Sequence, residues 1–476
     1  MFSAALILGL VWSAFGLDSP PGLDTPVACQ RIAAEVSNAT YVYYPGSLSY
    51  DADNKHYINS SSQRSGCSVE PGSVEDVGTI LRILGETRTC FGVKGGGHAT
   101  NQGFSSTTGV QIAMTRFVDV TYDQDTQTAV VGAGNIWDDV YDVLNARGVN
   151  VLGGRASGIG VAGFTLGGGY SWQSNQYGLA IDNVVAYELV MPNGKVTTVT
   201  ASTDQDLFFS LKGGGNNFGI VTRFTLKTFP QGNIWGGTTV YPATVIPAFT
   251  AAAAKFSSEV TDPKAAMLIT FEYAARQIVL ATIMMYDSPA PPRGIFDDFL
   301  NMTSLRLDVK ERSFVDLINS MPSKVTPRTI SNDIPVSNYS KDTIDSLVEE
   351  LKYWGEKLVS DNSAYVAYTL EPFLPTLFDH AGAGSSAYPG SRERLALPTE
   401  VNLGWVSESE DGVFHDAARE MTRKLGMEGA SRYPNYAIFG TPVVDMYGEE
   451  GLKRMVTTRE RVDSSGVMQL TGGFKV

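Results

Sequence analysis

Three glycine clusters within residues 93–221 constrain the structure of this chain more than any other feature. They read VKGGGHA, GGRASGIGVAGFTLGGGY and LKGGGNNFGIV, and they begin at Val93, Gly153 and Leu211. Glycine allows backbone N–H groups to turn toward an anion and approach it closely, which is how phosphate-binding loops are built. Three clusters so near one another favour a large ligand that carries a diphosphate. A series of tight β-turns in a glycine-rich scaffold is the alternative.

The second cluster contains the pattern G-x-G-x-x-G at Gly158, Gly160 and Gly163, which is typical of dinucleotide-binding Rossmann folds. That motif needs a buried strand before it and a continuous helix after it. Here three more glycines follow at residues 167–169, and each glycine costs a helix about 1 kcal/mol. We therefore expect no Rossmann site. The sequence also has no P-loop motif.

Composition limits the number of domains and the kinds of molecule that this chain is expected to bind. The chain has 476 residues, 43% of them hydrophobic, which is enough for two or three domains with sizeable cores. Its formal net charge of −14 argues against nucleic acid and anionic membrane surfaces as partners, because these attract basic proteins. The four histidines and three cysteines form no closely spaced cluster, so we expect no metal site.

The N-terminus predicts export from the cell. Residues 4–15 are apolar and small residues follow them, so we expect a signal peptide over residues 1–17. A short N-terminal anchor is the alternative, since no Lys or Arg precedes the apolar run. Sequons for N-glycosylation support secretion and begin at Asn38, Asn59, Asn301 and Asn338. In an oxidising compartment, three cysteines favour one disulfide and one buried thiol.

Hydrophobic periodicity predicts an α+β chain. Residues 24–62 read as irregular, and short strands and helices alternate from there to about residue 230. An Asn-Gly turn at Asn193 and Gly194 predicts a hairpin. The glycine content falls after Ile234, which suggests a second domain. The expected helices span 74–84, 137–146, 204–211, 247–260, 341–359 and 411–425. The expected strands span 91–94, 109–114, 126–131, 186–191, 195–200, 219–228, 267–273 and 277–285.

Four ordered motifs carry a family resemblance. VKGGGHATNQGFSS, the stretch from GGRASGIG to LAIDN, DLFFSLKGGGNNFGIVTRFTL and the terminal YPNYA to GGFKV resemble the berberine-bridge-enzyme-like FAD-linked oxidases. These belong to the vanillyl-alcohol-oxidase superfamily and have a PCMH-type FAD-binding domain. AYPGSR together with YPNYA is most similar to the fungal secreted members, and the resemblance runs from Cys29 to Val476.

The resemblance implies a domain plan. We expect a two-part FAD-binding domain over residues 24–231 and an α+β substrate domain over 232–430. The substrate domain is expected to have an antiparallel sheet covered by helices. Residues 431–476 are expected to return to the FAD domain. The family's structural disulfide aligns with Cys29 and Cys90, which leaves Cys67 as the buried thiol.

The resemblance also implies how FAD is bound. The histidine of the first cluster, His98, aligns with the residue that carries a covalent bond to the 8α-methyl group of the flavin. Family members often add a second link through a cysteine, but the aligned position is Ala156, so we expect one link. The other implied cofactor contacts are Lys94, Gly95, Gly96, Gly97, Ala99, Gly154, Gly158, Gly160, Gly163, Gly219, Ile220, Val221 and Asn435.

The expected reaction is hydride transfer from a small organic substrate to the flavin, with O2 as the final acceptor and a positioned base taking the substrate proton. Tyr436 and Tyr388 are the preferred candidates for the base, while Glu371 and Asp379 are further ones. Arg155 either holds a substrate or flavin oxygen or is a surface residue. His380 and His415 are weaker candidates, because His415 reads as an exposed helical residue.

Three substrate readings remain open at this point. We favour a secondary metabolite, because Trp235, Trp354 and Trp405 do not form an evident sugar-binding platform. A sugar oxidase is the second reading, and a flavin-bound cyclase or binding protein without net redox turnover is the third. We expect the protein to be a monomer.

Overall fold

The computed structural model describes residues 25–476 except 322–326, 362 and 394–395. The expected signal peptide lies outside these residues. The first sheet of the described chain has four strands in the order β1-β2-β4-β3, in which β2, β4 and β3 run parallel. Helix α3 (Val74–Thr87) connects β2 to β3 and begins at the predicted cap, Ser73. The strands are β1 (Tyr41–Tyr43), β2 (Cys67–Glu70), β3 (Phe91–Lys94) and β4 (Val110–Ala113).

The prediction of an irregular segment over residues 24–62 is wrong. It contains helix α1 (Thr25–Glu35), β1 and helix α2 (Leu48–Asn54). Helix α1 buries Ala28 and Ile32 against the core, and it contacts α3. Its apolar stripe is narrow and the flanking residues are polar, so the periodic signal is weak.

A five-stranded antiparallel sheet follows, in the order β5-β6-β10-β8-β9. The predicted hairpin is confirmed: β8 pairs with β9, and Gly194 in the turn has a φ of +83°. Short β7 (Val149–Asn150) and β11 (Phe229–Pro230) pair beside this sheet. The strands are β5 (Val120–Asp123), β6 (Thr128–Gly132), β8 (Val184–Val190), β9 (Val196–Val199) and β10 (Ile220–Lys227). The helices of this part are α4 (Trp137–Asn145), α5 (Val161–Leu166), α6 (Ser174–Tyr177) and α7 (Gln205–Leu211).

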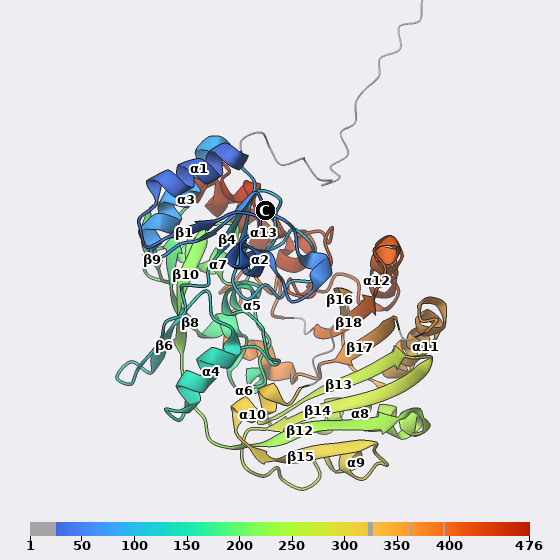
Figure 1. Cartoon of the computed structure of the whole chain (residues 1–476). Helices are drawn as coiled ribbons and strands as arrows, with labels where there is room; N and C mark the ends of the chain where they lie inside the picture. Colours follow the sequence, from blue (N-terminus) through green and yellow to red (C-terminus); the bar gives the residue numbers. More distant parts are fainter. Residues whose placement is uncertain (1–24, 322–326, 362, 394–395) are drawn as a thin grey trace, which may run out of the picture.

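Residues 234–405 contribute a seven-stranded antiparallel sheet in the order β15-β12-β14-β13-β17-β18-β16. Helices α8, α11 and α12 cover its outer face (Figure 1). The strands are β12 (Ile234–Pro242), β13 (Ala265–Ala274), β14 (Gln277–Tyr286), β15 (Arg306–Arg312), β16 (Arg328–Val336), β17 (Tyr365–Leu370) and β18 (Leu397–Trp405). The helices are α8 (Ile246–Glu259), α9 (Asp297–Leu300), α10 (Phe314–Asn319), α11 (Lys341–Leu358) and α12 (Asp411–Leu425). The predicted α+β class, with a helix-covered antiparallel sheet, is confirmed.

The C-terminal segment returns to the first part of the chain. Helix α13 (Val444–Val462) contacts α7 (Figure 1). Thr471 pairs with Phe91 at the start of β3. The side chains of Asn216 and Asn217 donate to the backbone carbonyls of Gly472 and Phe474. The tail is therefore bound to the third glycine cluster. The bounds 24–231, 232–430 and 431–476 stay a prediction.

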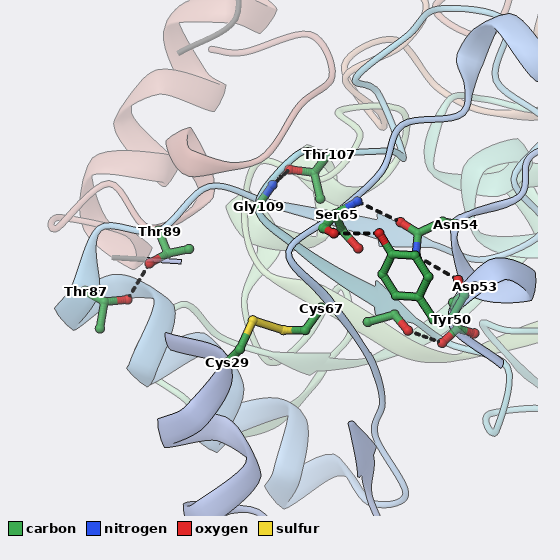
Figure 2. Close-up of a disulfide and its surroundings, with 11 residues drawn as sticks. Cys29, Tyr50, Asp53, Asn54, Ser65, Cys67, Thr87, Thr89, Thr107 and Gly109 are labelled. Atoms are coloured by element: carbon green, nitrogen blue, oxygen red, sulfur yellow. Dashed lines mark hydrogen bonds between the residues drawn. A yellow bond between two sulfur atoms is a disulfide. The ribbon is translucent and has the colours of Figure 1, made fainter. Parts of the chain in front are cut away.

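The disulfide prediction is wrong. Cys29 on α1 pairs with Cys67 on β2, with Cα atoms 6.2 Å apart, within the usual range for a disulfide (Figure 2). Cys90 is an exposed, unpaired thiol in the described chain. The sheet order explains the difference, because β4 separates β2 from β3, and Cys90 directly precedes β3.

Candidate functional site

The first two glycine clusters touch through their backbones. A Cβ atom added to Gly96 would lie 2.5 Å from the Cα of Gly160, and one added to Gly160 would lie 2.4 Å from the N of Gly96. Real Cβ atoms do not approach so closely, so the contact requires glycine at both positions. The crossing point joins the loop after β3 to the start of α5, where Gly160 is the N-cap.

The second cluster lines open space. No atom lies within 4 Å of a Cβ placed on Gly158 or Gly163, and Gly158 has a φ of +84°. Helix α5 ends after six residues at Gly167, so the expected interruption of this helix by glycine is confirmed. The N–H groups at the start of a helix favour anions. Glycine backbone beside open space at a helix start therefore fits an anionic group such as a diphosphate.

His98 lies in the turn that follows β3. Its imidazole stacks on the ring of Tyr57, with centroids 4.2 Å apart and planes inclined by 15°. Gly97 turns the chain with a φ of +68°, and its carbonyl O accepts from the N–H of Tyr57 at 3.0 Å. Burial lowers the pKa of His98 to about 4. The imidazole is therefore neutral at physiological pH and keeps a nitrogen lone pair that can form a bond to carbon.

The other expected cofactor residues occupy several places. The Nζ of Lys94 donates to the carbonyls of Ala52 and Lys55, at 2.8 and 2.9 Å, so its ammonium group holds the α2 segment. Gly219 packs on the carbonyl of Val190 with a φ of +139°. Ile220 and Val221 begin β10, Ala99 follows His98 in its turn, and Gly95 and Gly154 lie in the first two clusters.

A buried triad lies where the second cluster meets the seven-stranded sheet. Arg155 forms an ion pair with Glu371, Nη2 to Oε2 at 2.8 Å, and donates to the hydroxyl of Tyr436 at 2.9 Å. Tyr436 in turn donates to Oε1 of Glu371 at 2.6 Å. Only 1% of the Glu371 side chain is exposed, and Arg155 is also buried. The alternative that Arg155 is a surface residue is therefore wrong.

Burial and neighbouring charges shift the pKa values of Glu371 and Tyr436. Burial raises the pKa of Glu371, while the charge of Arg155 lowers it. Burial and the Glu371 charge together raise the pKa of Tyr436 well above its ordinary value. Tyr436 is therefore protonated at rest, and its hydrogen is held by a carboxylate that accepts protons more readily than an exposed one.

Asn435 attaches the returning segment to the second cluster. Its side-chain amide donates to the carbonyl of Phe164 at 3.1 Å and to the hydroxyl of Tyr433 at 3.0 Å. A Cβ on Gly167 would lie 2.1 Å from Oδ1 of Asn435, so a side chain at this position would have to displace the Asn435 amide. The residue next to Tyr436 thus fixes its position over the end of α5.

Tyr388 does not join the triad. Its side chain is buried, its hydroxyl pairs with that of Tyr170 at 2.9 Å, and its ring packs on Gly168. Asp379 and His380 are exposed. His415 is partly buried beside Trp405, which differs from the exposed position expected.

Sequence reasoning missed the polar residues on the face of the seven-stranded sheet that is not covered by α8, α11 and α12, which we call the uncovered face. On β18, Glu400 accepts from Ser331 at 2.7 Å, and Asn402 donates to Ser331 at 2.8 Å and accepts from Tyr365. Burial raises the pKa of Glu400, and the charge of Glu371 adds to this effect. The available signal was the alternation in TEVNLGW, where Glu400 and Asn402 flank buried Val401.

A family model described as an FAD binding domain matches residues 66–200. An FAD-dependent monooxygenase, drtC, from Aspergillus calidoustus is 30% identical over 97% of this chain and 92% of its own. The bifunctional solanapyrone synthase of Alternaria solani is 37% identical over 93% and 88%.

Solved structures share the fold. BBE-like 1 of Physcomitrella patens superposes with a TM-score of 0.77 at 19% identity, covering 92% of this chain and 97% of its own. Glucooligosaccharide oxidase from Acremonium strictum, described with a 6-S-cysteinyl, 8α-N1-histidyl FAD, gives 0.76 at 17% identity over 92% and 97%.

Fold, glycine clusters and relatives together define an FAD-dependent oxidoreductase. The chain belongs to the family of FAD-linked oxidoreductases that includes these two fungal relatives, and it has the fold of the BBE-like proteins. Within the residues that the structure describes, no helix is long and apolar enough to span a bilayer. The same residues contain no cluster of three or more His, Cys, Asp or Glu that could hold a metal ion.

Proposed function

We propose that this protein is an oxidase that takes a hydride from a small organic molecule and passes the electrons to O2. The observation that supports this most directly is the buried triad of Arg155, Glu371 and Tyr436, located between the second glycine cluster and the uncovered face of the sheet. A substrate bound between these surfaces would meet a proton acceptor on one side. The FAD, when bound, supplies the hydride acceptor.

Tyr436 and Glu371 act together as the base in this proposal. A substrate O–H approaches the hydroxyl oxygen of Tyr436, which takes the proton while its own passes to Glu371. The donor and acceptor are already 2.6 Å apart, so the second transfer needs no rearrangement. Arg155 keeps Glu371 ionised before the reaction, which leaves it able to accept. Tyr388 has no part in this transfer, because its hydroxyl is paired with Tyr170.

We further propose that FAD is attached through His98 alone. The neutral imidazole of His98 supports a covalent bond, and Gly96, Gly158, Gly160 and Gly163 offer the backbone for the phosphates. Ala156 has no thiol, so the second link described for the Acremonium strictum oxidase has no counterpart at this position. The disulfide supports secretion, since such bonds persist in oxidising compartments.

The substrate class in the proposal is a secondary metabolite. Two relatives at 30% identity or more are named as an FAD-dependent monooxygenase and a solanapyrone synthase, whereas the glucooligosaccharide oxidase shares only the fold. The aromatic residues Trp235 and Trp405 stack on Phe296 and Phe414, residues of the helix-covered side of the sheet. That placement argues against a sugar platform built from these rings.

An aerobic substrate screen on the purified protein tests the proposal. Flavin bleaching and peroxide release are followed together with candidate metabolites and with oligosaccharides. Bleaching and peroxide with a metabolite support the oxidase. Peroxide with sugars alone moves the assignment to a sugar oxidase. A substrate that is converted without bleaching or peroxide would indicate a cyclase instead.

A further inference from the structure

Tyr57 is attached to the His98 turn twice. Its ring lies flat on the imidazole, with centroids 4.2 Å apart and an angle of 15° between the planes. Its backbone N–H donates to the carbonyl O of Gly97 at 3.0 Å. The position of the imidazole plane therefore depends on where the chain holds Tyr57.

The segment that carries Tyr57 is also hydrogen-bonded to residues at the start of β16, an edge strand of the seven-stranded sheet. The N–H of Ser60 donates to the carbonyl of Pro327 at 3.1 Å, and the hydroxyl of Ser60 accepts from the N–H of Thr329 at 3.4 Å. The hydroxyl of Thr100, two residues after His98, accepts from the N–H of Ser331 at 3.3 Å. Strand β16 and the residue before it thus bind both the segment that carries Tyr57, at Ser60, and the loop that carries His98, at Thr100.

We propose that Tyr57 is a positioning residue for covalent attachment of FAD at His98, an inference that rests on the link proposed above. In this step a ring nitrogen of His98 forms a bond to the 8α carbon. A methyl C–H bond and the imidazole N–H bond break. The two electrons and two protons released pass to the flavin ring, and O2 removes them as hydrogen peroxide.

The attacking lone pair of an imidazole lies in the plane of its ring, so the tilt of that plane decides whether it meets the carbon. A misplacement of about 1 Å in a reacting group can cost about 100-fold in rate. The stack with Tyr57 covers one face of the imidazole and restrains its tilt. The flat ring of Tyr57 supplies this restraint, so phenylalanine should replace it and a branched aliphatic side chain should not.

The test compares full-length wild type with Tyr57→Phe, Tyr57→Leu and Tyr57→Ala. The matched control is Tyr44→Ala, an exposed tyrosine on the same N-terminal segment. Each protein is produced under riboflavin limitation, mixed with FAD, and sampled over time by acid precipitation. Covalent flavin is read from the pellet and from the mass of the tryptic peptide 95–116. Reversible FAD binding is measured separately by quenching of flavin fluorescence.

We expect Tyr57→Phe and Tyr44→Ala to attach flavin at the wild-type rate. Tyr57→Leu and Tyr57→Ala should bind FAD reversibly but attach it at least about tenfold more slowly. Equal rates in all variants overturn the role of Tyr57 and leave the His98 link intact. A Tyr57→Phe variant as slow as Tyr57→Ala also overturns it. A wild-type protein without covalent flavin refutes the proposed link and this inference with it.

Discussion

Arg155 and Glu371 form an ion pair, 2.8 Å long and buried, between the second glycine cluster and the loop that follows β17. The pair joins two loops that are 216 positions apart in the chain (371 − 155), one before α5 and one after β17. A buried charge is costly unless it is paired. The contact therefore couples the placement of the seven-stranded sheet to the protonation state of Glu371.

Replacing Tyr436 by phenylalanine should lower kcat by about 10²- to 10⁴-fold, the usual contribution of a positioned acid or base. The substitution removes the hydroxyl that donates to Glu371 and leaves the glycine clusters unchanged. FAD content and the flavin spectrum should remain normal. Steady-state kinetics on the substrate found by the screen provides the measurement.

Tyr388→Phe is the matched control for that variant. Its hydroxyl pairs with Tyr170, so the change should cost about 1 kcal/mol of stability and leave kcat unchanged. A Tyr436→Phe enzyme with wild-type turnover, or a Tyr388→Phe enzyme with a large loss, would show that the base was assigned to the wrong tyrosine.

Arg155→Met should destabilise the protein by about 3–5 kcal/mol at neutral pH, because it leaves the Glu371 carboxylate buried without a cation. The pKa of Glu371 is already raised by burial, and loss of Arg155 raises it further. A carboxyl group with a raised pKa in the folded state stabilises the fold below its unfolded pKa, and this stabilisation is lost as pH rises through the folded value. The deficit of the variant should therefore shrink in acid.

Melting temperatures of wild type and Arg155→Met, measured from neutral pH down toward pH 4, provide the check. Arg419→Met on the exposed face of α12 is the control, and it should change stability by less than about 0.5 kcal/mol. The ascending limb of the activity profile should also move to higher pH in Arg155→Met. A deficit that does not vary with pH would mean that Glu371 does not ionise.

His98→Ala should still bind FAD through the glycine clusters but release it on acid precipitation. Loss of the proposed covalent bond should lower the flavin potential and slow substrate oxidation, with the fold retained. A tenfold slower hydride step corresponds to about 1.4 kcal/mol in the barrier. Flavin occupancy, potential and turnover are measured on one preparation, and normal turnover at unchanged potential would contradict the role of the bond.

Peptide mapping without reduction should recover Cys29 joined to Cys67, and Cys90 should react with iodoacetamide in the native protein. The bond closes a loop with a sequence separation of 38, so Cys29→Ser should cost up to about 4 kcal/mol. Cys90→Ser should change stability by less than about 0.5 kcal/mol, because the thiol is exposed and unpaired in the described chain. Recovery of Cys29 joined to Cys90 would refute this pairing.

Local rules predicted local structure well. Helix α3 begins at the Ser73 cap, and the Asn193-Gly194 turn forms its hairpin, because in both cases the determining residues are neighbours in sequence. The disulfide prediction failed because the pairing of the cysteines depends on strand order. No residue near a cysteine in the sequence indicates that β4 lies between β2 and β3.

The residues of the candidate site also divide into those that a local motif predicts and those that only the fold brings together. His98 and the glycine clusters are recognisable because each is one continuous motif. Tyr436 was selected by resemblance, but nothing near Arg155 in sequence reveals that it pairs with Glu371. Tyr57 carries no motif at all, and only the folded chain brings its ring onto His98. Contacts between distant segments depend on packing that residue patterns do not specify.

The return of the C-terminal segment determines the order in which contacts around the glycine clusters can form during translation. Asn435 and Tyr436 reach the second glycine cluster, and Thr471 pairs with Phe91, yet all three are translated after both large sheets. A nascent chain that extends only as far as α12 contains all three glycine clusters in its sequence but lacks these contacts. Flavin capture in the final geometry must then wait until residues 435–471 have been translated.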